Sequence, residues 1–227
     1  MPATPLPPSG DVPSGPKTCD ASGMAMIHRV FRHQFGEAPR LVRGVRPGDT
    51  AHAAVVADHL QLISSALHTH HEGEEQRLWS ALDERAPSCA SHVARMKEQH
   101  LAILAPLGGL DAAIPVWRAT ATDPDAVLEA LDGINAALSV HLPDEEASIV
   151  PVMEVTLTEA EARWFGEHGR KATPKGQMWN TLGGILAAQP DGGEHFLRTE
   201  LPPPVRVLWS LVGRRRYERN FAALEGR

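Results

Sequence analysis

The sequence lacks features that mark several common classes of protein. Its 227 residues carry a formal net charge of −6, which does not favour a nucleic-acid partner. No apolar run approaches the ~20 residues of a membrane span, and the N-terminus has no apolar stretch like that of a signal peptide. We therefore expect neither a nucleic-acid nor a membrane partner.

Cysteine is also scarce, with Cys19 and Cys89 the only two. Residues 1–20 are rich in Pro, Gly and Ser and cannot bury apolar surface, so they are expected to form a disordered tail. Because Cys19 stands in that tail, a structural disulfide is not expected, and a reducing cytoplasm fits the composition.

Apolar residues at helical spacing predict an all-α fold, an up-down-up-down four-helix bundle over residues 21–155. The first three helices are expected over residues 21–45, 50–84 and 88–108, and the fourth begins at Asp123-Pro124. Gly108-Gly109 is expected to stop the third helix, with a further helical stretch after it.

The remaining residues, 156–227, are expected to form a helical extension. Thr158 and Glu161 have the spacing of a capping box, and short helices are expected at about 175–188, 193–199 and 203–225. Aromatic residues recur along this stretch, which predicts that it packs on the bundle rather than standing free in water.

Histidine is the abundant residue, with 12 copies. His70 begins the pattern H-x-x-x-E-E, and His141 begins a second copy of it. Residues four apart share one face of a helix, so each copy places an imidazole beside a carboxylate. Two such helices facing each other would bring four metal ligands to one point, as in the di-metal carboxylate sites of four-helix bundles.

One histidine on each of the other two helices completes the candidate ligand set. A lone buried histidine is more often a hydrogen-bonded core residue than a ligand, but the duplicated pattern favours metal binding. Four imidazoles and two carboxylates suit two iron or manganese ions, with coordination positions left open for a small ligand. The predicted ligands are His28, His70, Glu74, His100, His141 and Glu145.

The choice between Glu145 and Glu146 stays open at this point. Pro143 removes one backbone donor, and a local widening of the helix there would turn Glu146 inward. Alignment of the two copies of the pattern matches Glu145 with Glu74 and favours Glu145.

Several neighbouring polar residues are expected to lie outside the metal site. Sequence adjacency predicts that four of them point elsewhere, as outer partners or toward solvent: His71, Glu72, Glu75 and Glu146. His59 and His92 are weaker candidates for lining a channel to the site. The other histidines are expected at the surface: His33, His52, His68, His168 and His195.

The chain resembles the hemerythrin-like HHE cation-binding proteins, and its full length is similar to actinobacterial members of that family. The resemblance covers about residues 22–155 and rests on His28, the segments beginning at His70 and His141, and Glu98-x-His100. It implies a four-helix bundle holding two non-haem iron ions that can be bridged by oxide or hydroxide. It also implies that dioxygen or a related small ligand binds there.

One departure from the family is expected to matter. Invertebrate hemerythrins carry an H-x-x-x-H pair on the third helix, whereas Met96 stands four residues before His100 here. One imidazole of the oxygen carriers would then be missing, which argues against simple reversible oxygen carriage and leaves room for peroxide or nitric oxide chemistry.

We therefore expect a di-iron protein that binds dioxygen, peroxide or nitric oxide, in redox detoxification through peroxide decomposition. The alternative is a module that senses oxygen, redox state or iron, or stores the metal, without turnover. A closed structural zinc site fits six carboxylate-rich ligands less well.

Overall fold

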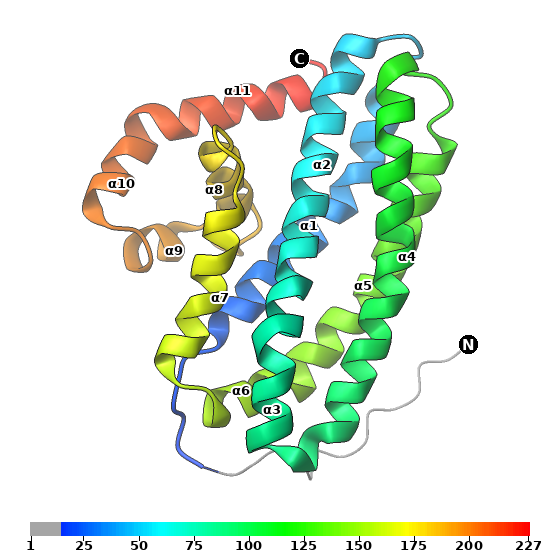
Figure 1. Cartoon of the computed structure of the whole chain (residues 1–227). Helices are drawn as coiled ribbons and strands as arrows, with labels where there is room; N and C mark the ends of the chain where they lie inside the picture. Colours follow the sequence, from blue (N-terminus) through cyan, green and yellow to red (C-terminus); the bar gives the residue numbers. More distant parts are fainter. Residues whose placement is uncertain (1–14) are drawn as a thin grey trace.

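Four long helical segments form an antiparallel bundle (Figure 1). The structure is a computed structural model that describes residues 15–227, and those residues form helices and turns without a strand. Each segment contacts the next around the bundle, and the first contacts the last. The segments are α1 (Ser22–Gly44), α2 (Thr50–Gly73) continued by η1 (Glu74–Leu78) and α3 (Trp79–Arg85), α4 (Ala90–Thr120), and α5 (Asp125–Ser148). The predicted all-α bundle is confirmed.

Two hydrophobic clusters fill the bundle, one at each end of a polar middle layer. The larger cluster contains Phe31, Phe35 and Leu60 with many aliphatic residues of α4 and α5. The smaller one contains Trp79 and Met96. The buried histidines and glutamates lie between them, so both ends of the polar layer are sealed by apolar packing.

The helix α4 does not stop at Gly108-Gly109 and continues to Thr120, so that expectation was wrong. Two glycines weaken a helix because they add backbone entropy to the unfolded chain. Here Leu110, Ile114 and Trp117 bury their side chains in the bundle core, and this burial outweighs the local penalty.

The segment Pro87–Thr120 is long and apolar enough to cross a membrane by length and composition alone, contrary to the sequence expectation. Core helices of soluble proteins meet the same two criteria. Ile103 and Leu107 of this segment lie in the bundle core, packed with residues of the other helices.

The segment expected as one fourth helix is divided. The helix α5 ends at Ser148, and α6 (Val150–Thr156) follows after a break at Ile149. Pro143 lies inside α5 without widening it. The widening occurs instead in the second segment, where η1 is a π-helical turn that inserts one extra residue between α2 and α3.

The expected tail is held to the bundle near its end. The backbone N–H of Thr18 donates to the carbonyl of Glu154 at 2.7 Å, and Cys19 is buried in the smaller cluster. Residues 18–20 are therefore part of the fold. Residues 15–17 are exposed, and residues 1–14 of the predicted disordered segment lie outside the described residues.

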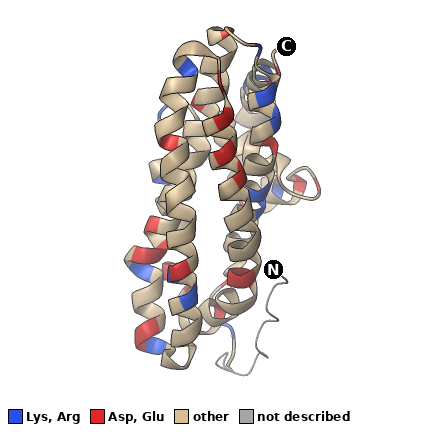
Figure 2. Ribbon diagram, turned by 90° about the vertical axis from the view of Figure 1, so that its right-hand side faces the viewer, with Lys and Arg blue, Asp and Glu red and all other residues tan. Residues whose placement is uncertain are grey.

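The C-terminal residues form short helices that pack beside α1 and α2 (Figure 1). The predicted capping box at Thr158 and Glu161 is present at the start of the first of them. The arginines Arg214–Arg216 are exposed at the start of the last helix. Figure 2 shows basic positions on the ribbon next to the C-terminus. The helices are α7 (Glu159–Ala172), α8 (Met178–Ala187), α9 (Glu194–Thr199), α10 (Pro203–Leu208), the π-helical turn η3 (Trp209–Gly213) and α11 (Arg214–Leu224).

The close approach of α4 and α5 gives a test of the packing. A Cβ atom on Gly133 would lie 2.9 Å from the Cβ of Pro106, whereas one on Gly108 would meet nothing within 4 Å. Gly108→Ala should raise the free energy of unfolding by about 1 kcal/mol, the usual helix-propensity gain. Gly133→Ala should lower it, because the two helices must move apart. Urea denaturation of both variants at equal metal content measures the free energy of unfolding. An equal increase in both variants would contradict the close packing of α4 and α5 at Gly133.

Candidate metal centre

Seven buried or nearly buried side chains meet between the two hydrophobic clusters. They are carried by all four segments of the bundle, and the least buried of them is His70, whose side chain is 10% exposed. The structure brings together all six residues that the sequence predicts, and it adds His71. The seven are His28 from α1, His70 and His71 from α2, Glu74 from η1, His100 from α4, and His141 and Glu145 from α5.

These side chains form two groups, each able to hold one metal ion. Within each group the potential ligand atoms lie within 4.8 Å of one another. We call them the three-residue group (His28, His70 and Glu145) and the four-residue group (His71, Glu74, His100 and His141).

Glu74 lies between the two groups. Its Oε1 is 3.1 Å from Nε2 of His70, and its Oε2 is 3.2 Å from Nε2 of His100. One carboxylate oxygen therefore faces each group, which is the arrangement expected of a carboxylate that bridges two cations.

Glu145 lies between the groups from the opposite segment. Its Oε2 is 3.3 Å from Nε2 of His28 and 3.4 Å from Nε2 of His141. Its neighbour Glu146 has a side chain that is 30% exposed and lies outside the cluster. The structure thus places Glu145, which the internal alignment favoured, on the inner face.

The expectation that His71 points away from the site was wrong. Its ring centroid is 4.2 Å from that of His100, and neither ring nitrogen has a hydrogen-bond partner. Adjacent residues of a helix differ in direction by about 100°. Since α2 contacts both α1 and α4, that angle lets His70 face His28 while His71 faces His100.

His71 also changes the comparison of imidazole numbers. The sequence places Met96 where the oxygen carriers have a second histidine on the third helix, and Met96 lies in the smaller hydrophobic cluster. The candidate metal centre nevertheless contains five imidazoles, because α2 supplies two of them. The doublet His70-His71, taken together with the missing third-helix histidine, was the signal that could have revealed this.

The π-helical turn explains how one segment serves both the site and the smaller cluster. The backbone N–H of Trp79 donates to the carbonyl of Glu74, five residues earlier. The extra residue rotates the following helix, so that Glu74 lies in the cluster while Leu78 and Trp79 are buried against apolar neighbours.

The outward nitrogen of three imidazoles is held by a partner outside the cluster. Nδ1 of His28 lies 3.0 Å from Oε1 of Glu146, whose carboxylate also accepts from Arg32 at 2.8 Å. Because a carboxylate only accepts, Nδ1 of His28 carries the hydrogen, and the lone pair of Nε2 faces the cluster.

His100 and His141 follow the same pattern with different partners. Nδ1 of His100 lies 3.4 Å from Oε1 of Glu75, which also accepts from Nε1 of Trp79 at 3.0 Å. Nδ1 of His141 lies 3.1 Å from Oε1 of Gln99. Glu75 and Glu146 are thus outer partners, as the sequence predicts.

Burial lowers the pKa of four of the five imidazoles. At His28 burial is outweighed by the neighbouring carboxylates of Glu145 and Glu146, which raise the pKa. Burial, followed by the charge of neighbouring histidines, lowers the pKa of His70 and His71 well below the usual range. Burial also lowers the pKa of His141 to about 4. Neutral rings with unoccupied lone pairs are the protonation state that binds metal.

The two carboxyl groups respond differently to burial. Burial and the nearby charge of Glu145 raise the pKa of Glu74 well above its usual range. Burial would also raise the pKa of Glu145, but the attraction of the neighbouring His28, followed by His141 and His100, outweighs it and lowers that pKa to about 2. An additional positive charge between the two residues would favour the anionic form of both.

The donor atoms that face the cluster fit a metal centre because they are buried and lack hydrogen-bond partners. This holds for Nε2 of His28, His70, His100 and His141, for both nitrogens of His71, and for both carboxylate oxygens of Glu74 and Glu145. Leaving so many buried polar atoms unpaired is costly unless a cation binds them.

The remaining histidines lie outside the cluster. His68 contacts Asp111 at 2.9 Å and His52 contacts the carbonyl of Leu224 at 2.9 Å. His168 is partly buried and stacks on Trp164 with ring centroids 4.6 Å apart, so it is not a plain surface residue.

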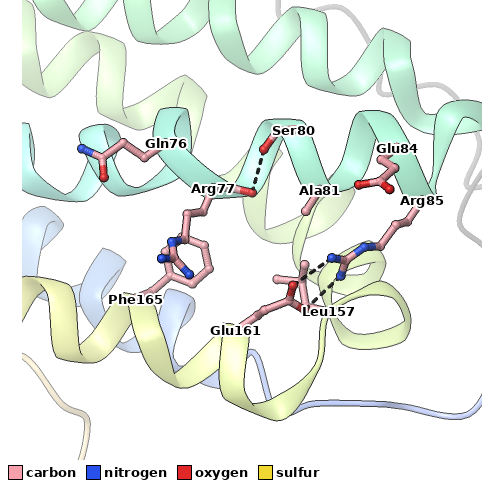
Figure 3. A pocket seen from close by; sticks show the side chains of 9 residues that line it. All are labelled: Gln76, Arg77, Ser80, Ala81, Glu84, Arg85, Leu157, Glu161 and Phe165. Atoms are coloured by element: carbon pink, nitrogen blue, oxygen red, sulfur yellow. Dashed lines mark hydrogen bonds and ion pairs between the residues drawn. The ribbon is translucent and has the colours of Figure 1, made fainter.

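A surface cavity of about 220 Å³ lies between the η1–α3 segment and α7 (Figure 3). Arg85 pairs with Glu161 across it, and Arg77 lies over Trp164 beside it. None of the seven cluster side chains lines this cavity, so the candidate metal centre is a separate, enclosed feature.

Comparison with known families adds one finding. A family model described as the hemerythrin HHE cation binding domain matches residues 21–153, more than half of the chain. No curated protein and no solved structure gives a significant match. The matched range contains all seven side chains of the cluster.

The role of His71 can be tested by its removal. His71→Ala should weaken the binding of one metal ion and leave the three-residue group able to hold another. Titration of metal-free protein with Co²⁺ measures both binding events. His68→Ala, a change three residues earlier at a partly exposed position, is the matched control and should bind as the unaltered chain does. Unchanged binding by His71→Ala would exclude it as a ligand.

Proposed function

This chain belongs to the hemerythrin HHE cation-binding family, and we propose that its buried cluster holds two iron ions that bind dioxygen, peroxide or nitric oxide. Within that range of ligands, we assign it to redox detoxification through peroxide decomposition. The proposal places the protein in the cytoplasm, which the scarcity of cysteine favours.

The position of the two glutamates carries this proposal. Glu74 faces imidazoles of both groups with separate oxygens, and Glu145 faces imidazoles of both groups from the other side of the bundle. Two carboxylates between two sets of imidazoles favour a pair of cations that share them. A single ion would leave part of the donor set unpaired.

The donor set supports iron over zinc. With Glu145 counted as shared, the four-residue group has five candidate donors, one more than a closed zinc site uses, and imidazole with carboxylate suits iron well. When bound, iron would supply redox chemistry and open coordination positions for a small ligand.

Burial limits what can reach the cluster. Three of the cluster side chains have no exposed surface: His28, Glu74 and Glu145. The cluster comes nearest to solvent at His70, and there the ring centroid of Phe31 lies 5.2 Å from that of His70. Such an enclosed site favours a ligand of two to four atoms over an organic substrate. The protein's part is to hold the donors, exclude bulk water and keep the lone pairs directed inward.

One contact favours the alternative, a sensing module without turnover. A Cβ atom on Gly73 would lie 3.3 Å from His168 and 3.6 Å from Trp164, so α7 packs closely on the residue before Glu74. A change in the position of Glu74 would therefore reach the C-terminal extension through direct packing.

Metal content and peroxide turnover distinguish these possibilities. Protein from iron-supplied cells should contain about two iron ions per chain, reduced by His70→Ala and by Glu145→Ala. It should consume hydrogen peroxide faster than free iron does, and His100→Ala should abolish the excess. His33→Ala, at an exposed position of the same helix as His28, is the control.

Two outcomes would count against this assignment. Iron uptake without peroxide turnover would favour the sensing or storage module, and that conclusion would gain support if metal changed the rate of proteolysis of α7. Absence of iron, or one tightly held zinc, would contradict the di-iron proposal itself.

A further inference from the structure

The outward nitrogens of His28 and His141 have chemically different partners. His28 faces the carboxylate of Glu146, which is 30% exposed and also paired with Arg32. His141 faces the neutral amide oxygen of Gln99 at 3.1 Å. One imidazole from each group is therefore supported by a different kind of group.

The amide of Gln99 is fixed in orientation. Its Nε2 donates to Oδ2 of Asp144 at 2.8 Å, and a carboxylate can only accept, so Oε1 must face His141. Because an amide oxygen also only accepts, Nδ1 of His141 carries the hydrogen. The lone pair of its Nε2 is thereby directed to the cluster.

Asp144 is itself held from several sides. Arg95 donates to its two oxygens at 2.7 and 2.9 Å, and the hydroxyl of Ser148 donates to Oδ1 at 2.8 Å. The side chain of Asp144 is only 8% exposed, so its charge is satisfied inside the protein. The side-chain amide of Gln99 cannot flip by 180° without breaking its hydrogen bonds with both Asp144 and His141.

The hydrogen bonds from Gln99 to Asp144 and from His141 to Gln99, which we call the relay, also join α4 and α5, two of the helices that carry candidate metal ligands. Gln99 precedes His100 on α4, and Asp144 precedes Glu145 on α5. The relay therefore fixes the ring of His141 at the level of the cluster. The hydrogen bond from Nδ1 of His28 to Glu146 does the same between α1 and α5.

We propose that Gln99 is a positioning residue for the ion of the four-residue group, acting through His141, and that Glu146 is its counterpart for the ion of the three-residue group, acting through His28. The inference rests on the proposed two-metal site. A carboxylate partner makes an imidazole a stronger donor than an amide partner does. The four-residue group has His141 on the amide of Gln99 beside His100 on the carboxylate of Glu75, whereas His28 of the three-residue group has a carboxylate partner alone, so the two ions would be inequivalent.

Titration of the metal-free full-length chain with Co²⁺ tests this, with visible absorption reporting the coordination of each ion. Gln99→Leu removes the acceptor at similar size, and Glu146→Leu does so on the other side. Each should weaken one of the two binding steps by about 10–100-fold and leave the other within about threefold. Glu146→Gln keeps an acceptor for His28 and should restore most of the affinity.

Paired backgrounds show which ion each residue serves. In His28→Ala, Gln99→Leu should still weaken binding of the remaining ion, and Glu146→Leu should have no further effect. In the His141→Ala background, Glu146→Leu should still weaken binding of the remaining ion, and Gln99→Leu should have no further effect. The Co²⁺ spectrum of the affected ion should change in each case, which a loss of general stability would not produce.

Three results would overturn the inference. The first is that Gln99→Leu leaves both binding steps unchanged, and the second is that it weakens both equally with a matching loss of thermal stability; either result would exclude selective positioning. If the unaltered chain bound fewer than two Co²⁺ ions, the proposed two-metal site would fail as well. The first two results leave that site intact, so the failures are distinguishable.

Discussion

The burial of two carboxyl groups beside each other is the constraint on which the rest of this structure depends. Glu74 and Glu145 have no exposed surface and come from opposite segments of the bundle. Such groups are costly to bury unless nearby positive charge and hydrogen bonds compensate them. The five surrounding imidazoles are mostly neutral, so they supply lone pairs rather than full positive charge. Metal cations bound among these side chains would satisfy the charge and the lone pairs together.

The fold maintains this polar layer by enclosing it. Apolar residues seal both ends, and the π-helical turn allows one segment to supply Glu74 to the layer and Trp79 to the cluster beyond it. Outside the layer, Glu75, Gln99 and Glu146 accept hydrogen bonds from the outward ring nitrogens. Glu75 and Glu146 each accept a further hydrogen bond from a neighbouring side chain, and the amide of Gln99 donates one to Asp144. The site is therefore determined by three successive shells of contacts, of which only the innermost touches the proposed metal.

The sequence predicted the parts that depend on local spacing. The interval between His70 and Glu74 places two donors on one helical face whatever the surroundings, and apolar periodicity predicts the bundle in the same way. The orientation of His71 depends on which helices flank α2, and this is a property of the assembled bundle. The position of the π-helical turn and the continuity of α4 through Gly108-Gly109 depend on core packing, which outweighs local preference. Sequence reasoning fails here where tertiary contacts decide between locally similar conformations.

The most direct test of the central claim is to locate iron in crystals of the iron-loaded protein by its anomalous scattering. The account predicts two peaks, one bounded by His28 and His70 and the other by His71, His100 and His141. Glu74 and Glu145 should each contact both peaks. A single peak, or peaks that do not contact both glutamates, would contradict the account.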